Sequence, residues 1–412
     1  MAVPAPESRF DQWLLLLQTF ALFALAAFVN FSIAGAHLSL GLLTLTFLVQ
    51  LVRTRAHGNW AALALGFEWP LLAFTLACLI ATLLSQAPFE SLRNLRHLLT
   101  VLGAYGVAYA LRNHPHWRKP LLWTFLAVAA GTAGYGLLRF LLGAHVKVMG
   151  TQSTTMTWGA LATMFALIAT QVALAAPAKR ERALALLALL PQLPALLFSM
   201  VRGAYVGYAA GVFYLLARQW RRALPIAAVV LVLAFLFSPA ALQQRILSIF
   251  DPNVTTTQVR LVQWQYALQI FADHPLFGVG WRDLAALTRS YAPPGTNMNE
   301  GIAFDVFHIG HYHSTYFTLL VSVGAVGLLA FGWLMVQVWR RLGWVLAQGN
   351  PEAKPLMRGV RAAMIGFLVS GLFDWTFGDA EVVTMFWFLI GFGLGQVEPA
   401  HASPSGSESA AA

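Results

Sequence analysis

The chain has 412 residues, of which 58% are hydrophobic and only 10% are charged, and its formal net charge is +10. A soluble globular domain has about a quarter of its residues charged, so this composition excludes an ordinary soluble protein. Apolar runs of membrane-spanning length recur from end to end and indicate a polytopic integral membrane protein. Basic residues collect in the cytoplasmic loops of such proteins, which explains the positive charge without nucleic-acid binding.

The apolar runs predict an all-α fold with about twelve transmembrane helices. The expected spans, in chain order, are 12–33, 37–52, 69–84, 97–111, 121–140, 157–176, 183–200, 203–217, 223–238, 314–338, 359–375 and 380–396. The first is not expected to be a cleaved signal peptide, although Ala34-Gly35-Ala36 resembles a cleavage site, because its apolar stretch is too long. The single cysteine, Cys78, lies in the third span, so no intrachain disulfide can form.

Basic residues predict how these spans are oriented. If the N-terminus is cytoplasmic, every short inner connection carries arginine or lysine, as the positive-inside rule requires. The chain then divides into nine spans (1–238), a periplasmic loop with catalytic elements (239–313), three spans (314–396) and a disordered cytoplasmic tail (397–412).

The outer loop 239–313 is much longer than the other connections, and loops of this length are usually functional or disordered. A helix is predicted inside it at 258–272, since Leu261 and Trp264 begin an apolar pattern of helical spacing. Thr257 is the expected N-cap residue of this helix. The loop is therefore expected to be partly helical.

Three titratable residues stand out at the outer face. Arg202 lies in a very short turn between the seventh and eighth spans, where it can serve either as an interfacial residue that reaches into water or as an anion-binding residue. Arg260 is expected in the first turn of the loop helix, where a cation opposes the helix dipole, which favours a ligand role. His313 opens the tenth span.

The histidines near the tenth span allow two interpretations. His308, His311 and His313 could bind a metal with support from Asp305 and Glu300, since imidazole is a common metal ligand. The spacing matches no strong metal motif, however, and a neutral histidine can also act as a general base. The general base is favoured, so neither a metal nor another cofactor is expected.

Three sequence elements resemble one family. "HSTYFTLLVSVGAVG", from His313 to Gly327, resembles the histidine motif of the O-antigen ligases, whose superfamily also contains O-antigen polymerases and protein O-oligosaccharyltransferases. "RLVQWQYALQIFADHPLFGVGW" (260–281) resembles the Arg-x-x-x-Trp and Pro-Leu-x-Gly-x-Gly elements of that superfamily. "SMVRGAYVGY" (199–208) resembles its Ser-Arg-Gly element, with Met200-Val201 where serine is common.

This resemblance implies glycan transfer at the periplasmic face of a bacterial inner membrane. The donor would be an O-antigen chain on undecaprenyl pyrophosphate, and the acceptor a sugar hydroxyl of the lipid A–core oligosaccharide. His313 would be the base, and Arg202 and Arg260 would hold the pyrophosphate during a single inverting, metal-independent displacement. The secondary site candidates are His311, Tyr312, Ser314, Arg282 and Lys147, and the outer carboxylates that could position substrates are Glu90, Asp374, Asp379 and Glu381.

Other functions stay open at this point. The O-antigen polymerases and the protein O-oligosaccharyltransferases share the histidine and the arginines, so these motifs do not separate the three activities. A lipid or polysaccharide transporter is less favoured, because transporters often show internal repeats and charges near the bilayer midplane. Here the charges gather at one face and no repeat is visible.

Overall fold

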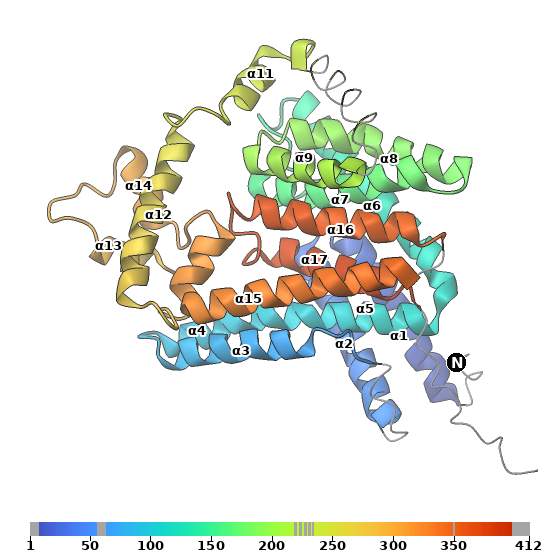
Figure 1. Ribbon diagram of the computed structural model, residues 1–412. Coiled ribbons are helices and arrows are strands. Elements are labelled where there is room, and N and C mark those ends of the chain that lie inside the picture. The colour runs from blue at the N-terminus through green and yellow to red at the C-terminus, as the bar shows by residue number, and fades with distance from the viewer. Residues whose placement is uncertain are drawn as a thin grey trace, which may run out of the picture.

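The computed structural model is helical throughout the part of the chain that it describes. The described residues are 8–55, 63–217, 235–348 and 351–397, together with the single positions 221, 225, 229 and 232. No strand occurs among them, so the predicted all-α fold is confirmed. Figure 1 shows the long helices lying side by side as a bundle. The bundle helices are α1 (Arg9–Phe28), α2 (Ile33–Arg55), α3 (Glu68–Leu83), α5 (Leu102–Asn113), α6 (Arg118–Leu141), α7 (Thr155–Ala175), α8 (Lys179–Leu197), α9 (Arg202–Leu216), α15 (Thr315–Gln348), α16 (Lys354–Ser370) and α17 (Ala380–Leu394).

Several of these helices can cross a bilayer, which makes the protein a multi-pass membrane protein. Five of the described helical stretches are long and apolar enough to cross a membrane, namely Arg9–Phe28, Ile33–Arg53, Pro115–Leu141, Thr155–Ala175 and Thr315–Gln348. Two shorter helices, α3 and α17, are also apolar. Every expected span overlaps helical residues, although most of the ninth, 223–238, lies outside the described residues. Most of the expected tail lies outside them as well. Twelve crossings therefore stay a prediction.

Small residues let the helices around the site approach closely. A Cβ atom on Gly207 of α9 would lie 2.8 Å from the carbonyl oxygen of Gly366 in α16, so the two backbones nearly touch there. Gly203 faces Phe373 beyond the end of α16, and Gly211 faces Leu167 of α7. Such contacts are typical of membrane helices, which gain little from hydrophobic burial against each other. They fix the outer end of α9 beside the turn between α16 and α17.

The outer loop contains four helices: α11 (Ala240–Leu247), α12 (Thr255–Asp273), α13 (Ala285–Ser290) and α14 (Gly301–His308). Figure 1 shows α12 running across the ends of the bundle helices. The predicted loop helix is thus present, but the expectation that Thr257 is its N-cap is wrong. The helix begins at Thr255 after Val254, and the Thr257 hydroxyl accepts a hydrogen bond from Arg202 instead.

Helix α15 is broken at Gly324, which has φ 67° and ψ −172°. In a continuous α-helix the N–H of Ala325 would bond to the carbonyl of Val321, one turn earlier. The loop segment 275–280 lies in the break and takes over these bonds. The four hydrogen bonds across the break are Ala325 N–H to Pro275 O (2.9 Å), Val326 N–H to Leu276 O (3.1 Å), Val279 N–H to Val321 O (3.0 Å) and Gly280 N–H to Ser322 O (2.9 Å).

Glycine is required on both sides of this contact. A Cβ atom on Gly324 would lie 2.2 Å from the Leu276 carbonyl oxygen, and one on Gly278 would lie 2.3 Å from that of Val321. Both glycines also have φ in the left-handed region that side chains disfavour. Gly278 of the Gly-x-Gly element and Gly324 of the histidine motif therefore lie on opposite sides of the same backbone contact, which we call the junction at Gly324.

Replacing Gly324 by alanine should destabilise the protein, because the added methyl collides with backbone and a left-handed conformation costs a non-glycine residue about 1–3 kcal/mol. Gly332→Ala is the matched control, since Gly332 lies in the same helix and a Cβ atom added there would meet nothing within 4 Å. Thermal unfolding in detergent should show a lower midpoint for Gly324→Ala alone. Equal midpoints for the two variants would contradict the junction.

Candidate active site

His313 lies at the junction between the outer loop and α15. It has φ 43°, a left-handed backbone conformation that is rare outside glycine. Its backbone N–H donates to Nδ1 of His311 at 3.2 Å. Two residues later, the backbone N–H of Thr315 donates to the carbonyl of Gly371 at 2.7 Å. The strained residue is therefore held from both sides, which is the usual condition for strain at a functional site.

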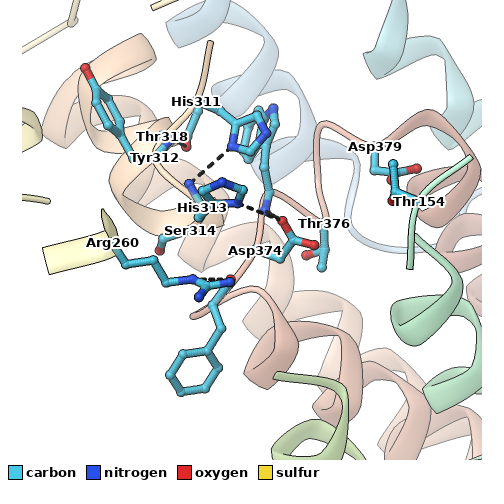
Figure 2. A network of polar contacts seen from close by, with 12 residues as sticks. Thr154, Arg260, His311, Tyr312, His313, Ser314, Thr318, Asp374, Thr376 and Asp379 are labelled. Atoms are coloured by element: carbon cyan, nitrogen blue, oxygen red, sulfur yellow. Dashed lines mark hydrogen bonds and ion pairs between the residues drawn. The ribbon is translucent and has the colours of Figure 1, made fainter. Parts of the chain in front are cut away.

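Asp374 faces His313 from the turn between α16 and α17 (Figure 2). The His313 Nδ1 atom lies 3.6 Å from Asp374 Oδ1, and the side chains are 13% and 22% exposed. The same carboxylate oxygen accepts the N–H of Trp375 at 2.9 Å, which fixes its position. Burial alone would raise the pKa of Asp374, but the nearby imidazoles of His313 and His311 and the backbone N–H of Trp375 more than offset this, so the pKa lies below its ordinary value. Asp374 is therefore an anion at neutral pH.

This pair has a known chemical use. A carboxylate on the Nδ1 side of a histidine favours the tautomer with its proton on Nδ1, which leaves Nε2 basic. The carboxylate also stabilises the imidazolium that forms when Nε2 takes up a proton. His313 thus has the environment of a general base. Its distance of 3.6 Å from Asp374 is longer than a direct hydrogen bond, as is common in an unliganded site.

His311 supports His313 rather than duplicating it. The two rings meet edge to face with centroids 4.7 Å apart. Burial, together with the charge of His313, lowers the pKa of His311 to about 4, so this ring is neutral at neutral pH and its Nδ1 can accept the His313 N–H. Its observed role is to position the His313 backbone.

Arg260 reaches the same turn from the loop helix α12. Its Nε donates to the carbonyl of Phe373 at 3.0 Å, and its Nη1 donates to the carbonyl of Thr256 at 2.9 Å. Burial lowers the pKa of Arg260, and the charge of Asp374 acts in the opposite direction. Phe373 precedes Asp374 in the chain, so Arg260 is anchored directly beside the His313 pair, as Figure 2 shows.

Arg202, at the start of α9, reaches α12 from the other side. Its Nη2 donates to the hydroxyls of Thr256 and Thr257 at 2.8 and 2.9 Å, and its Nη1 donates to the carbonyl of Ser248. Burial lowers its pKa, and the charge of Arg245 lowers it further. The sequence interpretation did not single out Arg245, which donates from Nε to the carbonyl of Met200 at 2.7 Å.

These arginines line one pocket of about 310 Å³. Four basic side chains border it, those of Lys147, Arg202, Arg245 and Arg260, with Asp374 as the acidic lining residue. Mutual repulsion of the cations is relieved when an anion binds between them. Arginine supplies a fixed fork of donors suited to phosphate oxygens, so the pocket is suited to a phosphate-containing group.

Three secondary candidates belong to the framework instead of the pocket. Tyr312 is 2% exposed, its hydroxyl lies 3.1 Å from that of Thr288, and Figure 2 shows its ring pointing away from His313. Ser314 is buried, and its hydroxyl contacts the start of α15. Arg282 is absent from the pocket lining. Only Lys147, of the basic secondary candidates, borders the pocket.

Two of the other outer carboxylates have structural partners. Glu90 accepts the backbone N–H of Asp283 at 2.8 Å. Asp379 caps the start of α17 and accepts the Thr157 hydroxyl at 2.6 Å. Of the possible metal ligands, His308 lies apart, with Nδ1 3.0 Å from the Phe304 carbonyl. Among the described residues no group of three or more His, Cys, Asp or Glu side chains is arranged to hold a metal ion.

Comparison with protein families assigns this region. Residues 184–332 match the family described as O-antigen ligase. This match supports the O-antigen ligase superfamily, which the sequence motifs resemble. The matched segment contains Arg202, Arg245, Arg260 and His313, whereas the turn that supplies Asp374 lies beyond it. No curated protein matches the chain.

The pairing of Asp374 with His313 has a testable effect on stability. Because the pKa of Asp374 is lowered in the folded state, its pairing stabilises the protein above the unfolded pKa of about 4, and the contribution is lost as pH falls through the folded-state value. Asp374→Asn should therefore lower the unfolding midpoint at about pH 7, with the difference from wild type shrinking below about pH 4.

The matched control for this measurement is Asp305→Asn, which removes an exposed carboxylate from α14. This variant should melt like the wild type across the same pH range. A constant difference between wild type and Asp374→Asn from neutral to acid pH would contradict a paired, ionised Asp374.

Proposed function

We propose that this protein ligates O-antigen polysaccharide from undecaprenyl pyrophosphate onto the lipid A–core oligosaccharide at the periplasmic face of the bacterial inner membrane. One observation carries the proposal: a histidine–carboxylate pair lies beside a pocket bordered by four cations, and His313 and the three arginines belong to the segment that matches the O-antigen ligase family. A base and an anion site are the two elements that glycosyl transfer from a pyrophosphate requires.

The proposed reaction is a single displacement with inversion at the anomeric carbon. Nε2 of His313 takes the proton of the acceptor hydroxyl as its oxygen bonds to the anomeric carbon. The bond from that carbon to the pyrophosphate oxygen breaks, and the electron pair leaves with undecaprenyl pyrophosphate. Arg202 and Arg260 stabilise the charge that develops on this leaving group, with Arg245 and Lys147 at the same pocket. Asp374 stabilises the protonated His313.

The location of the pocket suits two lipid substrates. Its apolar lining includes Met156, Leu261 and Phe373, which can contact the first part of an isoprenoid chain. Both substrates are amphiphiles whose reacting headgroups lie at the membrane surface, so the reacting groups can meet at the ends of the bundle helices. No step of the proposed reaction requires a divalent metal, because the arginines provide the charge stabilisation.

O-antigen polymerization and protein O-glycosylation are the alternative activities. They use the same type of donor and differ only in the acceptor, which is a second lipid-linked glycan or a protein hydroxyl. The base and pocket described above would serve each of them. The assay below therefore offers all three acceptors.

Purified protein should transfer glycan from the lipid-linked donor to lipid A–core, also in the presence of EDTA. His313→Ala should lower the transfer rate by about 10²–10⁴-fold, the usual contribution of a general base, while donor binding is kept. Arg202→Ala and Arg260→Ala should weaken both donor binding and transfer, and lysine should rescue only in part because it lacks the bidentate fork. His311→Ala should lower the rate less than His313→Ala.

Arg282→Ala is the control, since this arginine does not border the pocket. Near-normal transfer by a folded His313→Ala protein would refute the proposed base. Recovery of activity by one divalent ion after chelation would refute the metal-independent reaction. Transfer to a protein or to a second lipid-linked glycan, but not to lipid A–core, would reassign the acceptor.

The proposed periplasmic location of the loop 239–313 can be tested by labelling. A cysteine at the exposed loop position Asn299, in a Cys78→Ala background, should react with a membrane-impermeant thiol reagent in intact spheroplasts. Cys78 is the single cysteine of the sequence, so the Cys78→Ala protein without the added cysteine should not be labelled. Labelling only after lysis would place the loop in the cytoplasm and exclude a periplasmic reaction.

A further inference from the structure

A second pocket, of about 740 Å³, lies at the opposite end of the same helices. It is bordered by Tyr214 near the end of α9 and by Lys354 at the start of α16, whereas the first pocket is bordered by Arg202 and Ser370 at the other ends of these two helices. The two pockets therefore lie at opposite ends of the helix bundle.

Three cations, those of Lys354, Arg358 and Arg361, line the second pocket, and no acidic residue is among its lining residues. Their spacing of four and then three residues puts them on one face of α16, where like charges repel each other. Glu352, the acidic residue closest to them in the sequence, pairs with Lys119 at 3.0 Å. An anion bound in the pocket would remove this repulsion.

Arg361 lies two helical turns inside α16 and is partly buried. Its guanidinium carbon lies 3.7 Å from the ring centroid of Trp339 and 5.6 Å from that of Tyr214. Its Nε atom is buried without a hydrogen-bond partner. The positive-inside rule explains basic residues in loops. It does not explain why the Arg361 guanidinium lies between two aromatic rings with its Nε–H group buried and unpaired.

The remaining lining identifies the kind of anion. Leu215, Ala217, Leu346 and Ala347 make the rest of the pocket wall apolar, and the volume exceeds what one phosphate group needs. A phosphate attached to glycerol and acyl chains fits this combination of a cationic interior with apolar borders. Basic pockets between transmembrane helices are known to hold anionic lipid headgroups.

We propose that Lys354, Arg358 and Arg361 form a binding site for the phosphate of an anionic phospholipid, on the membrane face opposite the candidate active site. Arg361 donates to the phosphate from Nε, and Lys354 and Arg358 supply further charge at the rim. The proposal rests on α9, α15 and α16 alone and does not depend on the transfer reaction.

The test measures lipid binding by native mass spectrometry and thermal midpoints in nanodiscs. Wild-type protein should retain phosphatidylglycerol and melt higher in phosphatidylglycerol than in phosphatidylcholine discs. Arg358→Gln/Arg361→Gln should bind phosphatidylglycerol at least about tenfold weaker, the change expected from losing more than one charged hydrogen bond. Ala347→Trp, which fills the pocket without changing its charge, should weaken binding as well.

Arg340→Gln is the matched control, because Arg340 is exposed on α15 and does not line the pocket. Equal phosphatidylglycerol retention by wild type and Arg358→Gln/Arg361→Gln would overturn the site. An equal loss on Arg340→Gln would show that only general surface charge acts, and would overturn it too. If inorganic phosphate alone raised the midpoint in phosphatidylcholine discs as much as phosphatidylglycerol does, the ligand would be free phosphate and the lipid assignment would fall.

Discussion

The four backbone hydrogen bonds between segment 275–280 and the broken helix α15 position everything else at the candidate site. Within a membrane protein, backbone N–H and carbonyl groups that lose helical partners must find others, because an unsatisfied group in an apolar environment costs several kcal/mol. The loop segment provides those partners on both sides of Gly324. The helix can therefore be broken at Gly324 without losing these hydrogen bonds, and His313 lies at the start of its first part.

The turn between α16 and α17 then gathers the three parts of the site. Its Gly371 carbonyl binds the backbone of Thr315, its Phe373 carbonyl binds Arg260, and its Asp374 carboxylate faces His313. These contacts come from the loop helix α12 and from the start of α15, so the turn joins both to the bundle. The proposed reaction depends on this turn although it lies outside the segment that matches the O-antigen ligase family.

Helical periodicity and charge were enough to predict the all-α fold and the loop helix, and they singled out Arg202, Arg260 and His313 as site candidates. The partnership of Asp374 was not visible, because sequence showed only one outer carboxylate among several, and 61 residues separate it from His313. Arg245 was missed for the same reason, since only the fold brings it to Arg202. The break at Gly324 was hidden because "VSVGAVGLL" reads as continuous apolar helix, and its new partners lie in a distant segment.

The junction at Gly324 also bears on how the chain is made. Residues 275–280 leave the ribosome before 321–326, so the loop segment already exists when α15 enters the bilayer. Before that segment docks, the backbone N–H and carbonyl groups at the break have no partners from the loop. They are then either unpaired or bonded to each other in a temporary continuous helix. The final, broken form of α15 can therefore be reached only once the loop segment has docked, so completion of the helix bundle depends on the folding of this loop.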